Sequence, residues 1–551
     1  MRKYILPVIV IALAMISCNK TEPEKKDDKP KASIIGTVSC DGKPVPGVWV
    51  SDGIAPAVKT DENGKYALES RKKNGMVYIS MPSGYTVAAD KTVPQFFKHT
   101  TKGPAAQETI DFELIDAGDQ TKHKMLFIGD VHLMNKNNDL NQFKTFKDEI
   151  NAYVKAHPGE KIYGIQTGDC TWDMFWYSTY FKIPEYLTQA KDINLNVFYS
   201  MGNHDGDYKI ADDWEYATEF RKYYGPTYYS LNVGNIHYVV LDNVKTHNDP
   251  SQGTSGRDYS FGLTDEELAW LKDDLSHIDA DTPVVAFGHI PLFGTNGKAL
   301  MKGSNDMPTS DYVAPFSKFK DVRFISAHTH TMYNNVVAVD GKDIVENNIA
   351  ALCCDFWISG SYDPRTLICK DGTPGGYRIY DVDGNNVRMT YKAVGRDNYL
   401  FRAYDRNSIE ITAAKYCKKA DASHAREYEN YLYSFKKADN QNYIYVYVWD
   451  WQEGWTISVT ENGKALTGTM GAEYDPLYMI TSMVEKCNDA STGSFTLDYK
   501  PSQNQHCFKY KASSATSTVT IKVTDNYGNS RTEVMQRPKA FDVNTYGEEG
   551  R

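Results

Sequence analysis

Apolar, strand-like runs separated by helix-length polar stretches are the sequence feature that most constrains the fold of this chain. The first runs span 124–128 and 161–165, and similar runs recur as far as 322–325. Between them, 141–156 and 264–277 have the length and composition of helices. Strands that alternate with helices in this way predict an α/β domain with strands inside and helices outside.

Five short polar motifs follow these strand-like runs. They contain three carboxylates, one carboxamide and five imidazoles, in the order Asp130-Val131-His132, Gly168-Asp169, Gly202-Asn203-His204-Asp205, Gly288-His289 and His328-Thr329-His330. Ligand sites of α/β sheets lie beyond the carboxyl ends of the strands, so we expect the motifs to converge along one rim.

This set of ligands suits a pair of divalent metal ions. Two cations about 3.5–4 Å apart need one carboxylate that bridges them. Asp169 follows a glycine, which allows close approach of the backbone, and is the natural bridge. Asp130 and His132, two positions apart, can both turn toward one ion if the backbone curls at the end of the strand.

The five motifs in this order resemble those of the calcineurin-like metallophosphoesterase superfamily over about residues 123–350. The resemblance implies a layered α/β/β/α core, a sandwich of two sheets between helices, and two divalent ions of the manganese, iron or zinc class. It assigns one ion to Asp130, His132, Asp169 and His330. It assigns the second ion to Asp169, Asn203, His289 and His328, and makes His204 the counterpart of the family's catalytic histidine.

The sequence also departs from well-known branches of this superfamily. Trp172 stands where purple acid phosphatases carry a tyrosinate ligand, so a tyrosinate-bound ferric ion is not expected. Trp172-Asp173-Met174 replaces the Asp-Arg-Gly of protein Ser/Thr phosphatases, so the usual carboxylate partner of His204 is missing from its family position. Asp173 or Asp205 could substitute, and we take Asp205 as the second catalytic candidate.

The predicted activity is phosphoester hydrolysis by a hydroxide that bridges two metal ions, with His204 stabilising the phosphoryl oxygens or protonating the leaving group. The substrate class is a small-molecule phosphoester or a phosphorylated glycan. The motifs do not separate a monoesterase from a phosphodiesterase acting on glycerophosphodiesters, cyclic nucleotides or sugar-linked phosphodiesters. A surface glycan-binding protein with an inactive phosphoesterase domain is an alternative of another class.

Two flanking regions have the character of β-sandwiches. Residues 33–118 contain short β-type runs separated by Asp-Gly and Asn-Gly turns, and resemble the regulatory-like modules of exported bacterial proteins. Residues 377–551 lose helical periodicity and alternate polar with apolar residues, as in 443–449. We therefore predict all-β sandwich domains on both sides of a metallophosphoesterase domain at 119–376.

The N-terminal residues indicate export. Residues 1–18 combine a charged start with a short apolar run and end at Ser17-Cys18, which resembles a lipoprotein cleavage site. A polar tether follows at 19–32. We expect a lipidated Cys18 that holds the protein at a membrane, as an outer-membrane or cell-surface lipoprotein, or else a periplasmic protein.

Charge and cysteine content place further bounds on the partners and the compartment. The net charge of -10 provides no overall basic field, so nucleic acid is not an expected partner. Eight cysteines besides Cys18 are interpreted as structural, with a pair such as Cys487 and Cys507 possible and the pairing left open. The oligomeric state is not predicted.

Overall fold

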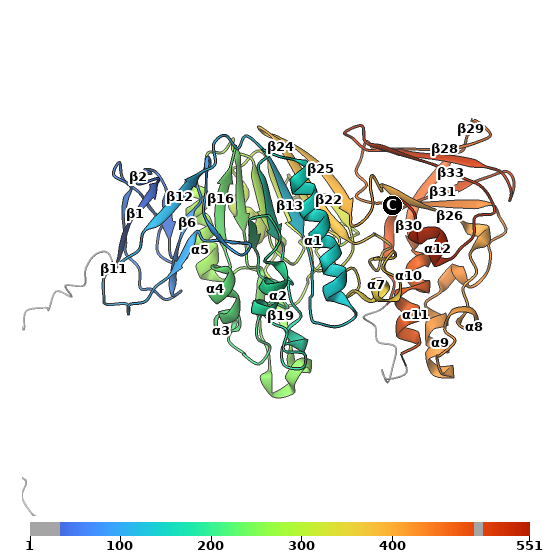
Figure 1. Cartoon of the computed structure of the whole chain (residues 1–551), viewed down its shortest axis with the longest axis horizontal. Helices are drawn as coiled ribbons and strands as arrows, with labels where there is room; N and C mark the ends of the chain where they lie inside the picture. Colours follow the sequence, from blue (N-terminus) through green and yellow to red (C-terminus); the bar gives the residue numbers. More distant parts are fainter. Residues whose placement is uncertain (1–32, 490–499) are drawn as a thin grey trace, which may run out of the picture.

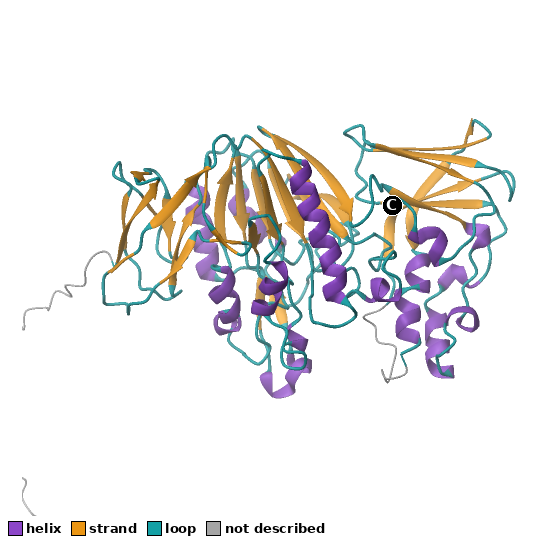
Figure 2. Ribbon diagram, viewed as in Figure 1, coloured by secondary structure: helices purple, strands orange, loops and turns teal. Residues whose placement is uncertain are grey.

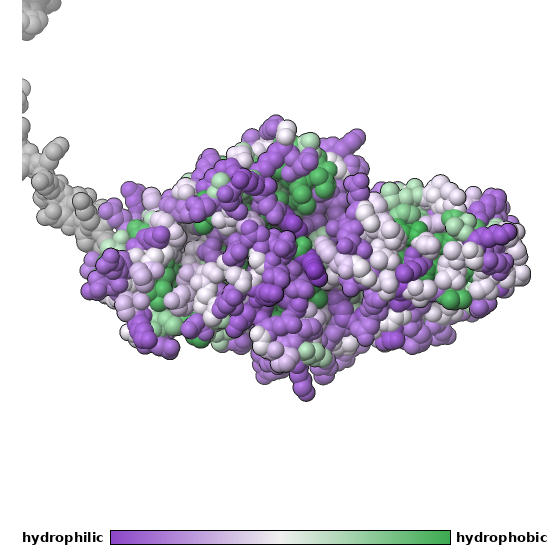
Figure 3. Space-filling model, turned by 90° about the horizontal axis from the view of Figure 1, so that it is seen from above, coloured by the Kyte–Doolittle hydropathy of each residue, from purple (hydrophilic) through white to green (hydrophobic). Residues whose placement is uncertain are grey.

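The computed structural model describes residues 33–489 and 500–551, arranged as three bodies in a row (Figure 1). The predicted signal peptide, Cys18 and the tether lie outside the described residues. Within the described part of the chain, no helix has both the length and the hydrophobicity required to span a bilayer. Hydrophilic side chains cover most of the face shown in Figure 3, and hydrophobic patches interrupt them.

The N-terminal body is a β-sandwich, as predicted. One sheet is built around β1 (Ile34–Cys40), which pairs with β5 (Lys65–Leu68) and β12 (Phe112–Asp116). The second sheet contains β3 (Trp49–Ser51) and β6 (Met76–Ser80). Buried and exposed residues alternate along β5, because successive side chains of a strand point to opposite faces of the sheet.

The central body contains two sheets packed face to face. The five-stranded sheet has the order β15 (Val197–Tyr199), β14 (Ile162–Gln166), β13 (Lys122–Ile128), β24 (Gly376–Asp383), β25 (Asn386–Ala393). The six-stranded sheet has the order β16 (Tyr229–Val233), β17 (Ile236–Val240), β20 (Val284–Phe287), β21 (Val322–Ser326), β23 (Lys342–Asn348), β22 (Tyr333–Val339). The rings of Phe127 and Phe287 meet between the sheets with centroids 6.1 Å apart.

Helices cover the outer faces of this sandwich, which confirms the predicted layered core (Figure 2). In α1 (Asp139–Ala156), Phe143, Phe146 and Ile150 are buried at the spacing of one helix face, and Phe146 contacts Tyr377 of β24. The helix predicted at 264–277 is α5 (Asp265–Ser276), and the Thr264 hydroxyl caps its first turn by accepting the Glu267 N–H at 3.2 Å.

The five-stranded sheet extends past the predicted domain boundary at residue 376. Strand β24 pairs antiparallel with β13, and β25 pairs with β24, so the sheet is complete only at Ala393. Arg378 of β24 is fully buried and forms an ion pair with Asp450 of the C-terminal body. The predicted boundary therefore falls at the start of the last hairpin of the central sheet.

The C-terminal body contains two four-stranded sheets. One includes β26 (Phe401–Asp405), β27 (Tyr443–Val448), β31 (Gln503–Lys511) and β30 (Gly468–Tyr474), and the other β29 (Lys464–Ala465), β28 (Thr456–Glu461), β32 (Val519–Thr524) and β33 (Ser530–Met535). Val446, Val459 and Ile521 belong to the core between them.

The C-terminal body also contains helices that the sequence did not predict. They are α8 (Ala413–Tyr416), α9 (Ala422–Asn430), α10 (Pro476–Ile480), α11 (Ser482–Cys487) and α12 (Val543–Gly547), and they lie beside the sheets (Figure 2). The longest has 9 residues, which is too short for a clear helical periodicity.

All eight cysteines in the described part of the chain are free thiols. Cys487 of α11 is hydrogen bonded to Cys417, which follows α8. The cysteine suggested as its partner, Cys507, lies in β31 opposite Tyr447. The pair that the sequence offered is therefore not the one that the fold brings together.

A buried histidine makes stability depend on pH. The His123 ring nitrogens lie 2.9 Å from the Gln120 carbonyl oxygen and 2.7 Å from the Tyr238 hydroxyl, and burial lowers the His123 pKa to about 4. In the unfolded chain the His123 ring takes up a proton below about pH 6.5, whereas in the folded protein it stays neutral down to about pH 4. The free energy of unfolding therefore falls as the pH drops from about 6.5 to about 4. The wild type should lose about 2 kcal/mol more unfolding free energy between pH 7.5 and pH 5.0 than His123→Gln does, and urea unfolding at the two pH values measures this difference.

The exposed His99 provides the control for this measurement. His99→Gln should lose as much stability as the wild type over the same pH interval. If the His123→Gln and wild-type proteins also lose equal amounts, the buried neutral state of His123 is not responsible.

Candidate metal centre

The five motifs meet at one edge of the central sandwich, as predicted. Strands β13, β14 and β15 run parallel to one another, and β20 runs parallel to β21. The motifs follow the carboxyl ends of these strands. Positions far apart in the sequence are thereby brought within hydrogen-bonding distance of each other.

Asp169 lies at the middle of the cluster. Its Oδ2 atom lies 3.3 Å from His132 Nε2 and 3.0 Å from His289 Nε2. Its Oδ1 atom accepts the backbone N–H of His204 at 2.8 Å, which fixes the orientation of the carboxylate. A single oxygen therefore faces both halves of the cluster, the arrangement that a bridging ligand requires.

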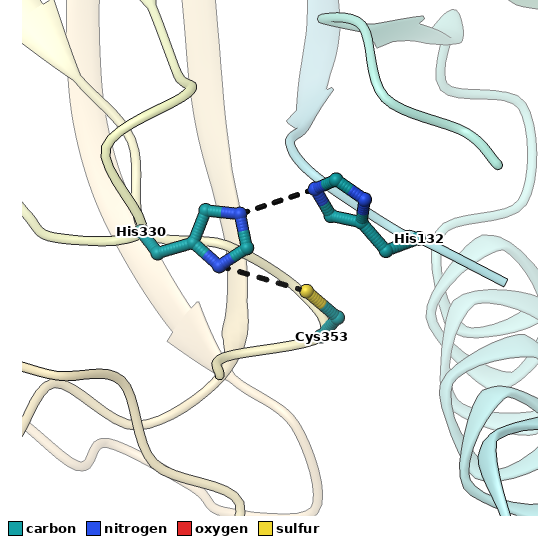
Figure 4. A group of neighbouring side chains, drawn as sticks. All are labelled: His132, His330 and Cys353. Carbon is teal, nitrogen blue, oxygen red and sulfur yellow. Dashed lines mark hydrogen bonds between the residues drawn. The ribbon is translucent and has the colours of Figure 1, made fainter. Parts of the chain in front are cut away.

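Asp130, His132 and His330 form the first half of the cluster. His330 Nε2 lies 3.6 Å from Asp130 Oδ1 and 3.1 Å from His132 Nε2 (Figure 4). The other nitrogen of His330, Nδ1, donates to the Cys354 carbonyl oxygen. This hydrogen bond leaves the Nε2 lone pair directed into the cluster, as in histidine ligands of metal ions.

Cys353 is a neighbour of this half that the sequence did not indicate. Its Sγ atom lies 3.9 Å from His330 Nδ1, on the side of the ring away from His132 (Figure 4). The thiol is fully buried. Adjacent cysteines at 353 and 354 carried no motif that could have placed one of them here.

Asn203, His289 and His328 form the second half with Asp169. His289 Nε2 lies 3.0 Å from Asn203 Oδ1 and 3.2 Å from His328 Nδ1. The opposite nitrogen, His289 Nδ1, donates to the Thr167 carbonyl oxygen at 2.9 Å. His289 Nε2 thus faces two acceptor oxygens, Asp169 Oδ2 and Asn203 Oδ1, and a proton or a metal ion between these atoms would satisfy them.

The electrostatics of the cluster fit this interpretation. Burial raises the pKa of Asp130 to about 7. Burial lowers the pKa of His289, but the Asp169 carboxylate outweighs it and the pKa rises to about 9. Burial and the neighbouring His289 lower the pKa of His328 to about 3. In addition, the buried His132 Nδ1 has no hydrogen-bond partner among the described residues. The side chains present therefore fit divalent cations.

The backbone is strained at the same residues. Asp130, His132, Asp169, His328 and His330 have φ angles of 44°, 44°, 57°, 67° and 55°, in the left-handed region that residues with a side chain rarely adopt. Each such residue costs about 1–3 kcal/mol. The chain curls at Asp130 and His132, as expected if both side chains are to reach one ion, and it curls in the same way at His328 and His330.

Three family models match the chain, and all three describe parts of calcineurin-like phosphoesterases. The N-terminal model matches residues 32–117, the phosphoesterase model 123–332, and the C-terminal model 346–530. The chain belongs to the calcineurin-like phosphoesterases. It is accordingly a metal-dependent phosphoric ester hydrolase, with the flanking domains that this family architecture includes.

The solved structures to which this chain is similar are distant from it in sequence. The anchor protein of the inner membrane complex of Plasmodium is 12% identical over 50% of this chain and 85% of its own, with a TM-score of 0.31. A 5'-nucleotidase from Candida albicans is 13% identical over 50% of this chain and 51% of its own, with a TM-score of 0.29. The phosphopantetheinyl hydrolase of Mycobacterium tuberculosis is 15% identical over 42% and 91%, with a TM-score of 0.25. No curated relative matches the chain.

The candidate catalytic histidine of this phosphoesterase is held by an ion pair. His204 Nδ1 lies 2.7 Å from Asp173 Oδ1, and Arg257 Nε donates to Asp173 Oδ2 at 2.7 Å. Arg257 also donates to the Asn203 carbonyl oxygen at 2.9 Å. Of the two carboxylates weighed from the sequence, Asp173 is the one that contacts His204. Arg257 comes from a loop without a motif and was not predicted.

The prediction that Asp205 is the catalytic partner is corrected by its hydrogen bonds. Its carboxylate accepts backbone N–H groups of the Asp169 turn, from Asp169 at 2.6 Å, Cys170 at 2.9 Å and Thr171 at 3.2 Å. It also accepts the Gly202 N–H at 3.2 Å. Asp205 is fully buried, and its hydrogen bonds connect the turn that carries Asp169 with the turn that carries Asn203.

Replacing Asp205 with asparagine should therefore lower stability. The amide NH₂ group would face two backbone donors in a buried site, which should cost about 2–3 kcal/mol of unfolding free energy. Chemical denaturation measures this loss, and Asp192→Asn at an exposed position serves as the control. Unchanged stability together with lost activity would instead restore a catalytic role for Asp205.

The aromatic residues near the cluster divide into two groups. Trp172 and Phe356 stack with centroids 4.0 Å apart, and both contact the His132 ring edge-on. Trp176 and Trp357 are fully buried in the core. The hydroxyl of Tyr259, not predicted, lies 3.2 Å from His328 Nε2 on the other side of the cluster.

Proposed function

We propose that this phosphoesterase uses two divalent metal ions to hydrolyse a small-molecule phosphoester outside the cytoplasm. The observation that carries the proposal is the position of Asp169, one oxygen of which lies 3.3 Å from His132 Nε2 and 3.0 Å from His289 Nε2. A bridging carboxylate between two sets of nitrogen and oxygen ligands is the requirement of a two-metal site.

The proposed division of the ligands is the one that the sequence resemblance implies. One ion would be held by Asp130, His132, Asp169 and His330, and the other by Asp169, Asn203, His289 and His328. The mixed nitrogen and oxygen set is compatible with manganese, iron or zinc. When bound, such ions lower the pKa of a water molecule toward neutrality and offset the charge of a phosphate group.

His204 would act on the leaving group. His204 Nδ1 is engaged by Asp173 Oδ1 at 2.7 Å and by Arg257 Nη2 at 2.8 Å, which leaves Nε2 as the nitrogen available to a substrate. A ring nitrogen of His204 lies within 4.8 Å of ligand atoms of His132 and Asp169, so it can reach a phosphate bound at the cluster. A proton held at Nε2 stabilises a phosphoryl oxygen or passes to the departing alkoxide.

The proposed location rests on the sequence of the N-terminal residues. An export signal that ends at Cys18 would lead to lipidation of that cysteine, and the polar tether would hold the three domains off the membrane. Incorporation of labelled palmitate into the wild type, and none into Cys18→Ala, would support the anchor. Labelling of neither protein would contradict it.

Elemental analysis of the purified protein, paired with hydrolysis assays, tests the proposed chemistry. We expect about two divalent ions per chain, and release of nitrophenol from 4-nitrophenyl phosphate that a chelator abolishes and added metal restores. Hydrolysis of bis(4-nitrophenyl) phosphate alone would show that the enzyme is a phosphodiesterase. Failure on both substrates with metal present would contradict the proposal and leave a glycan-binding role as the alternative.

A further inference from the structure

A groove of about 610 Å³ lies between the central body and the C-terminal body, and Thr329 of the His-x-His motif is part of its lining. Its size is within the range of small-molecule sites. Its lining comes from four segments, namely Gly294, Thr295, Asn296, Lys298, Ala299, Leu300 and Lys302, then Thr329, Thr331 and Tyr333, then Tyr474, and last Pro501, Ser502, Gln503 and Gln505.

Two walls of the groove continue the loops that carry metal-ligand candidates. Thr329 lies between His328 and His330 in the sequence. The segment 294–302 follows His289, and its base is fixed because the backbone N–H groups of Leu292 and Phe293 donate to Glu346 at 2.7 and 3.0 Å. The groove therefore begins at the loops that hold the reacting centre.

The C-terminal body supplies the third wall. Tyr474 of β30 pairs in register with Gln503 of β31, and the Tyr474 ring stacks on Tyr433 with centroids 3.9 Å apart. The backbone N–H of Ser502 donates to the Lys370 carbonyl oxygen at 3.0 Å, which attaches this wall to the central body. Both bodies are thus needed to form the groove.

The charge of the lining is unlike that of the whole chain. The chain has a net charge of -10, yet the groove residues include two lysines, Lys298 and Lys302, and no aspartate or glutamate among the described residues. Both lysines are exposed, and neither forms an ion pair within the described part of the chain. The groove therefore offers a positive field to an anionic ligand.

Two acidic side chains close in sequence to the lining residues are already engaged. Glu473, next to Tyr474, forms an ion pair with Lys509 at 2.9 Å. Asp306 accepts backbone N–H groups from Phe261 at 2.7 Å and Gly303 at 2.5 Å. These carboxylates have hydrogen-bond partners of their own, so the ammonium groups of the groove face solvent.

We propose that the groove binds the alcohol portion of the substrate, and that this portion is an acidic sugar. The inference rests on the proposed function, in which the phosphoryl group is held by the metal ions. Threonine, asparagine and glutamine side chains suit sugar hydroxyls, the partly exposed Tyr474 ring provides a flat apolar contact, and Lys298 and Lys302 pair with a carboxylate.

Two substrates that differ only in one group test the inference. Glucuronic acid 1-phosphate carries a carboxylate where glucose 1-phosphate carries a hydroxymethyl group. We expect the wild-type enzyme, loaded with metal, to favour the acidic substrate by about tenfold or more in kcat/KM, since a charge-assisted hydrogen bond contributes this much. The double variant Lys298→Gln/Lys302→Gln should bring the ratio close to one.

The matched control removes the same charge at the far end of the molecule. Lys43 and Lys65 are exposed in the N-terminal body, and Lys43→Gln/Lys65→Gln should keep the wild-type ratio. Calorimetric titration with glucuronate supplies a second measurement that needs no turnover. Binding to the wild type that is lost in the groove variant supports the inference.

The outcomes separate this inference from the proposed function. Hydrolysis of 4-nitrophenyl phosphate without any preference for the acidic sugar would overturn the groove assignment and leave the phosphohydrolase intact. A preference that survives in the groove variant would do the same. Absence of all hydrolysis would contradict the proposed function. The glucuronate titration would then decide the groove assignment, because wild-type binding that is lost in the groove variant supports it and absence of wild-type binding overturns it.

Discussion

Asp169→Asn is expected to lower kcat/KM by roughly 10³-fold or more and to reduce the metal content below that of the wild type. The carboxylate oxygen that faces both His132 and His289 carries the negative charge shared by the two sites. An amide in this place is neutral and cannot bridge two cations, so several kcal/mol of charge stabilisation are lost. Elemental analysis and phosphate release measure the two effects.

Asp192→Asn is the matched control, because Asp192 is exposed and lies outside the cluster. It should retain wild-type metal content and activity. Unchanged metal content and hydrolysis in Asp169→Asn would require the assignment of the metal centre to be abandoned. Circular dichroism of the variant would establish that any loss is not a loss of folding.

His204→Gln is expected to lower kcat by about 10²- to 10⁴-fold while metal content stays at the wild-type level. The reason is the loss of a proton donor held 2.7 Å from Asp173 rather than the loss of a ligand. The reduction should be larger for an alkyl phosphate, whose leaving group needs a proton, than for 4-nitrophenyl phosphate. Steady-state kinetics on both substrates measure this difference.

Asp173→Asn tests the same role through its partner. It should lower kcat in the same direction by a smaller factor, since the ring remains but loses the group that orients it. His99→Gln, at an exposed histidine of the N-terminal body, should change nothing. Equal losses on both substrates in His204→Gln would indicate that His204 binds phosphate and does not protonate the leaving group.

The ligand cluster could be predicted from the sequence because short sequence motifs beside strand ends determine it. Each candidate ligand follows a strand within a few positions, and parallel strands place their carboxyl ends at one edge whatever the intervening loops do. Arg257 could not be predicted in this way. It lies on a loop just before β19 (Tyr259–Phe261), and only the packing of that loop brings its guanidinium to Asp173.

Adjacency in the sequence misled the assignment of Asp205. A residue next to His204 is a natural choice of partner, but the turn that begins at Gly202 points consecutive side chains in different directions. The His204 ring turns toward Asp173, whereas the Asp205 carboxylate turns back to the amides of the Asp169 turn. Only the backbone conformation, which motifs do not encode, distinguishes the two carboxylates.

The layered core and the N-terminal sandwich could be predicted from hydrophobic periodicity and turn signals, but one edge of the core could not. The stretch at Gly375-Gly376 has the composition of a linker, yet β24 begins there and pairs with β13, which is remote in sequence. Pairing between strands so far apart depends on which sheet edge is left open after the rest of the core has formed.

The hairpin of β24 and β25 limits where the chain can be truncated. A fragment that stops at residue 376 would lack β24, the neighbour of β13 in the central sheet. Strand β13, which is apolar and buried, would then be an exposed edge strand, and such an edge is a template for aggregation. A fragment that stops at Ala393 would keep β24 and β25 in the sheet. It would still leave the Arg378 guanidinium without the Asp450 carboxylate that neutralises it. Fragments intended for expression should therefore carry the central and C-terminal bodies together.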